Sequence, residues 1–160
     1  MYPSRFLPAA LLLAVGTSAA IAQEQPRNNL YFELGGNGLF SSINYERQLT
    51  TTPGLQVRAG VGFYSEKGLY LTVPVGINYL FPLNDKRSFV DAGLGATWAI
   101  DEGRLSTKDR ASTESFFNII PSVGYRRHAA NNLMWRISVG PVINNTAFTP
   151  WAGVSIGKRF

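Results

Sequence analysis

The sequence predicts an all-β protein, an eight-stranded antiparallel up-and-down transmembrane β-barrel preceded by a cleaved signal peptide. Three observations carry this prediction. Apolar side chains alternate with small or polar ones along almost all of the chain after residue 28. The first 22 residues have the pattern of a secretion signal. The last strand is amphipathic and ends on Phe160.

The N-terminal segment 1–22 is predicted to be a signal peptide. Arg5 supplies the positive region, residues 6–15 are apolar, and Ala20-Ile21-Ala22 fits the small-x-small cleavage rule. The apolar run is too short to span a hydrocarbon core of about 30 Å, which argues against a helical anchor. Cleavage after Ala22 leaves residues 23–28 as a short periplasmic lead-in and residues 29–160 as the barrel.

Eight segments have the side-chain period of two that a strand requires. The segment 55–64 is the clearest, because every second residue from Leu55 to Phe63 is apolar and the residues between are small or polar. The predicted strands are residues 29–35, 39–48, 55–64, 69–81, 90–100, 117–126, 133–143 and 152–160. Residues 36–38 are predicted to form a tight turn, followed by Leu39 on the apolar face and Phe40 on the other.

The composition of the two faces favours a membrane barrel over a soluble one. The apolar face is almost unbroken, whereas the other face carries few charges among many glycines. This division fits lipid outside and a polar lumen inside. Most segments have the roughly 9–11 residues of a tilted membrane strand. Two predicted aromatic belts support the same reading, one of Tyr45, Tyr79, Tyr125 and Phe160 and the other of Phe63, Trp98 and Phe117.

Three prolines count against this interpretation. Pro74, Pro121 and Pro141 lie within predicted strands and each removes a ladder hydrogen bond. They are therefore the places where the predicted registers are most prone to slip.

An even number of strands puts both termini on one side, which we expect to be the periplasm. The connections 50–54, 82–87 and 127–132 then become periplasmic turns. The connections 36–38, 65–68, 101–115 and 144–149 become external, and the longest loop falls outside as is usual for such barrels.

Six charged residues are predicted to point into the lumen, and they are the candidate site. They are Glu33, Glu46, Arg58, Asp91, Arg126 and Arg136. We expect them to fill a narrow barrel as ion pairs, with Arg136 paired to Glu33 or Asp91, because unpaired buried charges are costly. The alternative is that they line a polar pore or a solute site.

The composition excludes several other classes of function. The chain has no cysteine and one histidine, so no metal site and no cofactor is predicted. Its formal net charge is +5, and the basic residues are scattered, so nucleic-acid binding is not expected. Asp101 and Glu102 could hold a divalent cation together with lipid phosphates, but the same loop is also rich in Lys and Arg and is expected to be simply solvated.

The final strand resembles the C-terminal signal strand of Gram-negative outer-membrane barrels. Val154, Ile156 and Phe160 carry this resemblance, which implies recognition by the barrel assembly machinery. The chain as a whole resembles the small outer-membrane β-barrels that include the OmpA membrane domain. The resemblance implies a monomer in the outer membrane, in contact with lipid and lipopolysaccharide, with a role in envelope integrity, adhesion or lipopolysaccharide interaction.

These observations lead us to expect a non-enzymatic barrel with a structural or surface-interaction role. A narrow pore or small-solute transporter is the alternative. A lipid A-modifying enzyme is the third candidate, but its site would lie near the outer rim. His128 is expected to be an exposed residue of the periplasmic turn 127–132, and Ala129 and Ala130 follow it instead of a serine. No catalytic residue is therefore predicted.

Overall fold

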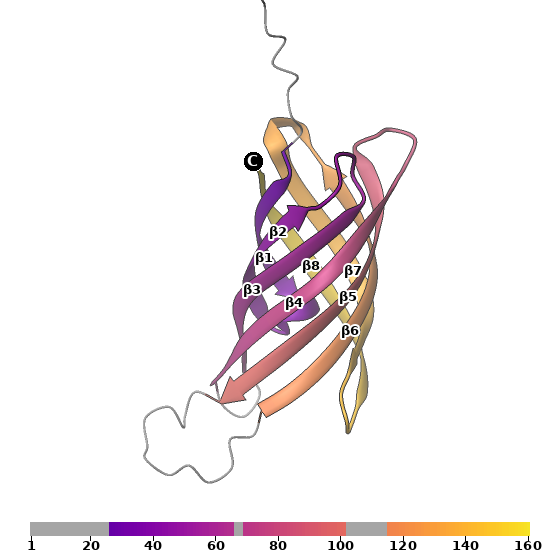
Figure 1. The fold of residues 1–160 in the computed structure, drawn as a ribbon. Helices are drawn as coiled ribbons and strands as arrows, with labels where there is room; N and C mark the ends of the chain where they lie inside the picture. Colours follow the sequence, from indigo (N-terminus) through magenta and orange to yellow (C-terminus); the bar gives the residue numbers. More distant parts are fainter. Residues whose placement is uncertain (1–25, 66–68, 102–114) are drawn as a thin grey trace, which may run out of the picture.

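The fold is a closed barrel of eight antiparallel strands in sequence order. The computed structural model describes residues 26–65, 69–101 and 115–160, so the expected signal peptide lies outside the described residues. The strands are tilted relative to the barrel axis (Figure 1). They are β1 (Asn28–Gly35), β2 (Ser41–Gln48), β3 (Leu55–Ser65), β4 (Leu69–Pro82), β5 (Ser88–Asp101), β6 (Ser115–His128), β7 (Leu133–Ile143) and β8 (Phe148–Arg159). The predicted up-and-down barrel is confirmed.

The last strand closes the barrel against the first. Asn29 of β1 lies opposite Arg159 of β8. The Asn28 and Phe160 backbones exchange two hydrogen bonds, of 3.0 and 2.9 Å. The start of β1 and the end of β8 therefore lie at the same end of the barrel, called here the terminal end, and the opposite end is called the loop end. No helix within the described residues is long and apolar enough to cross a membrane.

The barrel is apolar outside and polar inside. Side chains that face outward are about half exposed, for example Ile43 (60 %), Leu94 (50 %) and Val154 (55 %). Inward-facing charged side chains are almost fully buried, as with Glu33 (0 %) and Arg136 (1 %). This is the reverse of a water-soluble protein, in which the charges face the solvent.

The three prolines interrupt the strand ladders without shifting the registers. Pairing between β6 and β7 stops after Ile119↔Ile143 and resumes at Val123↔Val139 in the same register, which places Pro121 opposite Pro141. Pro141 lies opposite Pro150 across β7 and β8. The β3–β4 ladder has a similar interruption beside Pro74. A missing N–H therefore removes bonds here but does not require a bulge.

Several strands are longer than the alternation indicated. Strand β6 continues to His128, which pairs with Met134, so the turn that follows contains only Ala129 and the short 3₁₀ helix η3 (Ala130–Asn132). Strand β8 begins at Phe148 and not at residue 152. The loop between β7 and β8 is correspondingly short, and the Asn144 side chain caps it by accepting hydrogen bonds from the backbone N–H groups of Thr146 and Ala147.

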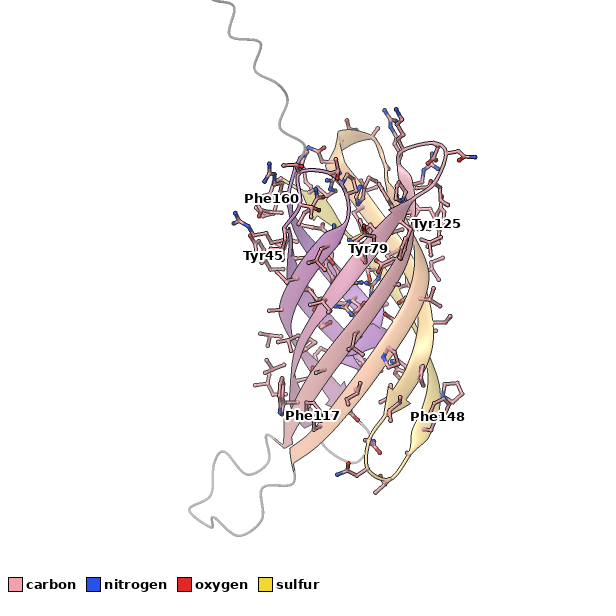
Figure 2. All side chains as sticks on the ribbon, turned by 45° about the vertical axis from the view of Figure 1, so that its right-hand side comes forward. Tyr45, Tyr79, Phe117, Tyr125, Phe148 and Phe160 are labelled. Atoms are coloured by element: carbon pink, nitrogen blue, oxygen red, sulfur yellow. The ribbon has the colours of Figure 1, made fainter. Side chains whose placement is uncertain are left out.

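Aromatic side chains lie at both ends of the barrel wall. Figure 2 shows Tyr45, Tyr79, Tyr125 and Phe160 at the terminal end, and Phe117 and Phe148 at the loop end. Neighbouring rings also contact each other. The centroids of Tyr125 and Trp135 are 5.3 Å apart, and those of Trp98 and Phe117 are 5.1 Å apart.

Candidate functional site

The six candidate charged residues lie together in the barrel lumen. They come from six different strands, and their relative exposures range from 0 to 4 %. Each occupies an inward position of the two-residue period, so the wall brings them together although they span residues 33–136. The strands that carry them are β1 (Glu33), β2 (Glu46), β3 (Arg58), β5 (Asp91), β6 (Arg126) and β7 (Arg136).

Arg126 forms the most complete set of contacts in this cluster. Its guanidinium group contacts both carboxylate oxygens of Glu46, with Nη2 at 3.0 Å from Oε2. Nη1 also donates to Oε1 of Gln56 at 2.7 Å, and Nη2 lies 2.7 Å from Oδ2 of Asp91. A planar guanidinium is suited to such bidentate contact with a carboxylate.

Arg136 connects Glu33, the third carboxylate, to Asp91. Its Nη2 lies 2.7 Å from Oε1 of Glu33, and its Nη1 lies 3.4 Å from Oδ2 of Asp91. Arg126 and Arg136 are directly opposite each other on β6 and β7, where two like charges would repel. Asp91 contacts both guanidinium groups and so offsets this repulsion. Asn78 holds the other Asp91 oxygen through a 2.5 Å hydrogen bond.

Arg58 is less completely paired than the other two arginines. Its Nη1 is 3.4 Å from the Tyr31 hydroxyl and 3.8 Å from Oε1 of Glu33. Its Nε and Nη2 atoms have no hydrogen-bond partner among the described residues. The nearby carboxylates instead make their shorter contacts with Arg126 and Arg136, so the cluster is tightest around those two residues.

The connection between β1 and β2, predicted as a tight turn on the external side, folds into the lumen at the loop end, which the prediction did not include. It forms the short 3₁₀ helix η1 (Gly36–Gly38), whose three residues are all buried. The wall holds its backbone, because the hydroxyls of Thr72 and Thr97 donate to the carbonyls of Gly38 (3.1 Å) and Asn37 (2.5 Å). The Asn37 N–H donates to Oε2 of Glu33 at 3.2 Å and so joins η1 to the charge cluster.

Glycines in the wall provide the space that η1 fills. A Cβ atom at Gly95 would overlap the side-chain amide of Asn37. One at Gly153 would lie 2.7 Å from the Gly36 backbone. These glycines are therefore needed because the inserted loop comes close to the strands. Asn37 is 1 % exposed, and neither side-chain amide atom has a hydrogen-bond partner among the described residues.

Leu39 extends this plug with apolar contacts. It lies in the lumen in one cluster with Ile120 and Val142, and Trp151 packs against them. Leu39 has φ 69° and ψ −87°, close to the rare classic γ-turn. This reversal exchanges the inward and outward faces of the residues next to it. Leu39 therefore faces inward, while Phe40 is 53 % exposed and contacts Phe63. The predicted faces of Leu39 and Phe40 were therefore wrong.

His128 does not occupy the exposed turn in which it was predicted. It is the last residue of β6, is 7 % exposed, and its ring centroid lies 4.6 Å from that of Phe89. Its place at the terminal end is far along β6 from the loop end. Within the described ranges, no group of three or more His, Cys, Asp or Glu side chains is arranged to hold a metal ion. The suggested cation site at Asp101 and Glu102 lies outside the residues whose side chains are described.

The candidate assembly residues form part of the apolar exterior. Val154, Ile156 and Phe160 face outward and are all more than half exposed. Val154 and Ile156 lie between Ile137 and Trp135 of β7 on one side and Leu34 and Phe32 of β1 on the other. Their surface is thus continuous with the apolar belt.

A second polar network lies at the terminal rim, outside the lumen. Asp85, in the turn before β5, accepts hydrogen bonds from the Ser88 hydroxyl (2.7 Å) and from the N–H groups of Ser88 and Arg87. Its carboxylate also lies 3.2 Å from Nη1 of Arg127. The hydrogen bond from the Ser88 hydroxyl is the largest cause that holds the pKa of Asp85 below its ordinary value. The backbone N–H groups of Ser88 and Arg87 and the charge of Arg127 act in the same direction.

Comparison with known proteins identifies the fold. No protein-family model matches the chain, and no curated protein matches it in sequence. Among solved structures, the N-terminal β-barrel domain of Pseudomonas aeruginosa OprF is similar, with a TM-score of 0.60. The similarity covers 86 % of this chain and 98 % of that domain at 9 % sequence identity. The resemblance to small outer-membrane barrels is thus confirmed for the fold.

Proposed function

We propose that the protein is a non-enzymatic outer-membrane β-barrel with a structural or surface-interaction role in the cell envelope. The observation that carries this proposal is a lumen occupied by buried polar and charged side chains inside an apolar wall. Exposed apolar side chains encircle the barrel, whereas a water-soluble monomer rarely exposes a large continuous apolar patch. Closure leaves no unpaired sheet edge in the hydrocarbon, as a membrane requires.

Two barriers support a structural role over a pore. The ion pairs around Arg126 and Arg136 fill one part of the lumen, and η1 with the cluster around Leu39 fills the loop end. An eight-stranded barrel has an interior that side chains alone can fill. We therefore propose that the lumen does not conduct ions. We also propose that both termini lie on the periplasmic side and that the barrel works as a monomer.

Planar-bilayer recording tests the sealed lumen. The purified barrel should insert without producing steady ohmic steps, and its change in gel mobility on heating provides an independent control for folding. Steady steps from the folded protein would contradict the sealed lumen and favour the pore. Lipid A mass spectra from cells with and without the protein should be identical, and a change that depends on the protein would favour the enzyme.

Deletion of Phe160 tests the proposed location and assembly route. The final strand supplies Val154, Ile156 and Phe160 as an exposed apolar row that the assembly machinery would read. We expect less heat-modifiable protein in the outer-membrane fraction when Phe160 is removed. Phe148→Ala provides a matched control, because it removes an exposed aromatic ring from the opposite end of the same strand. Equal reduction by both changes would contradict a specific role for Phe160.

A further inference from the structure

An apolar groove lies on the outer surface of the barrel near the loop end. Residues 139–141 of β7 line it, together with Phe148 and residues 150–152 of β8. Its volume is ≈ 590 Å³, within the roughly 300–1,000 Å³ of small-molecule sites. Phe148, which is 69 % exposed, and the partly buried Trp151 are the aromatic residues of its lining, and Phe148 lies at the loop end in Figure 2. The groove is therefore an open depression with room for one small ligand or part of a longer one.

The local sequence explains why the wall is hollowed at this point. Pro141 and Pro150 lie opposite each other, and the next outward pair along the strands joins Val139 to the small Ala152. The adjoining pair toward the loop end, by contrast, is Ile143 and Phe148. Small side chains thus lie beside larger ones on the outer wall, which leaves a depression in the apolar belt.

Prolines also make the groove rigid and reduce the number of hydrogen-bond donors in its backbone. Pro121, Pro141 and Pro150 follow one another across β6, β7 and β8. Each ring fixes its own φ angle and has no N–H group. The groove is therefore preformed, and it suits an apolar occupant that needs no hydrogen bond. A preformed site loses less conformational entropy when a ligand binds.

The size of the groove favours a single hydrocarbon chain over a protein. Seven residues line it, whereas a standard protein interface uses roughly 20–30 residues on each side. The groove is continuous with the apolar belt through Val139 and Val154, which are both more than half exposed. We propose that it holds one acyl chain of a membrane lipid. This proposal rests on the proposed membrane location.

Photo-crosslinking tests this site. The folded barrel is inserted into phosphatidylcholine vesicles in which a small fraction of the lipid carries a diazirine within one acyl chain. After illumination, the modified residues are mapped by mass spectrometry of peptides. We expect modification to concentrate on residues 139–152, well above the level on the outward residues of β3. Even modification around the belt would show ordinary surrounding lipid only and would overturn the proposal.

Matched variants separate groove binding from general lipid contact. Ala152→Phe fills the groove from an outward position and should remove most of the excess modification. Ala59→Phe adds the same ring on β3, away from the groove, and should leave the excess unchanged. Phe148→Ala removes the more exposed of the two aromatic rings that line the groove and should weaken the excess modification. It provides a second test if Ala152→Phe folds poorly. Unchanged modification in a folded Ala152→Phe barrel would overturn the proposal.

The same experiment distinguishes this inference from the proposed function. Modification spread evenly over outward residues overturns the groove but supports a barrel in lipid. Absence of modification on every outward residue would contradict the membrane location itself, and the groove proposal would fail with it. If residues 139–152 are modified more than the other outward residues, and this difference is lost in Ala152→Phe, both the groove and the membrane location are supported.

Discussion

The two halves of the lumen are filled in different ways by the same eight strands. Toward the terminal end, long charged side chains from opposite walls meet and pair, as Arg126 does with Glu46. Toward the loop end, the strands present glycines such as Gly95 and Gly153, and the chain itself folds into the space as η1. The first solution uses electrostatic pairing and the second uses backbone hydrogen bonds and apolar contact.

This difference has consequences for stability. A buried ion pair contributes little net stability, but loss of one partner leaves an uncompensated charge. An inserted loop, by contrast, depends on close packing, so small changes of volume matter there. Glu33 belongs to both halves, because its carboxylate contacts Arg136 and also accepts the Asn37 N–H.

Loss of Glu33 is therefore expected to have the largest effect. Glu33→Ala removes the acceptor of Arg136 Nη2, of the Asn37 N–H and of the Ser155 hydroxyl, and it should lower the free energy of unfolding by about 3–5 kcal/mol. Urea titration of the barrel in phosphatidylcholine vesicles, followed by tryptophan fluorescence, measures this value. The double variant Glu33→Ala/Arg136→Ala should lose less than the sum of the single losses. Additive losses would argue that the pair is not energetically coupled.

The apolar cluster of the loop half should be next in importance. Leu39→Ala removes a buried side chain and is expected to cost about 2–5 kcal/mol in the same titration. The backbone of Leu39 is strained, and such strain is of order 1–3 kcal/mol, so Leu39→Gly should be no less stable than Leu39→Ala. Leu94→Ala, at a half-exposed outward position, is the control for loss of the same side chain. A Leu39→Gly barrel clearly less stable than Leu39→Ala would rule out strain.

The strands and the charge cluster could be anticipated because their signal is local. The period of two predicts residues 55–64 as a strand, and β3 is Leu55–Ser65. The same period predicts that Arg58 faces inward, where it is 4 % exposed. Pairing partners, however, depend on the tilt of the strands, so Arg136 could be assigned only to either Glu33 or Asp91, and it contacts both.

The inward fold of η1 could not be anticipated in this way. Gly36-Asn37-Gly38 predicts a turn, but its direction depends on Thr97, 60 residues further along the chain, and on the space beside Gly95. A sequence signal exists in retrospect. Gly95 of β5 and Gly153 of β8 occupy inward positions, and the volume that they leave is taken by η1. An empty volume of this kind requires an insert.

Gly95→Ala tests whether the two halves seal the lumen independently. Its Cβ would meet the Asn37 side chain, so we expect a loss of about 1–3 kcal/mol in the free energy of unfolding from overpacking. Gly54→Ala, where the nearest atom is the flexible Thr50 hydroxyl at 3.0 Å, should have little effect. In planar bilayers Gly95→Ala alone should stay closed, whereas Gly95→Ala/Glu33→Ala should conduct. Conduction by Gly95→Ala alone would show that the charge cluster is no barrier.

The rim network provides the exposed counterpart of the lumen pairs and should have the smallest effect. Asp85 and Arg127 repeat the carboxylate–guanidinium contact, but both side chains are more than 40 % exposed. Because the folded pKa of Asp85 is lowered, its stabilisation is present above the unfolded pKa and is lost as the pH falls through the folded pKa. Urea titrations at neutral pH and below about pH 4, the ordinary range of an aspartate pKa, should therefore show a small difference between wild type and Asp85→Asn at neutral pH that shrinks in acid. A loss as large as that of Glu33→Ala would contradict the conclusion that burial makes the lumen pairs costly to break.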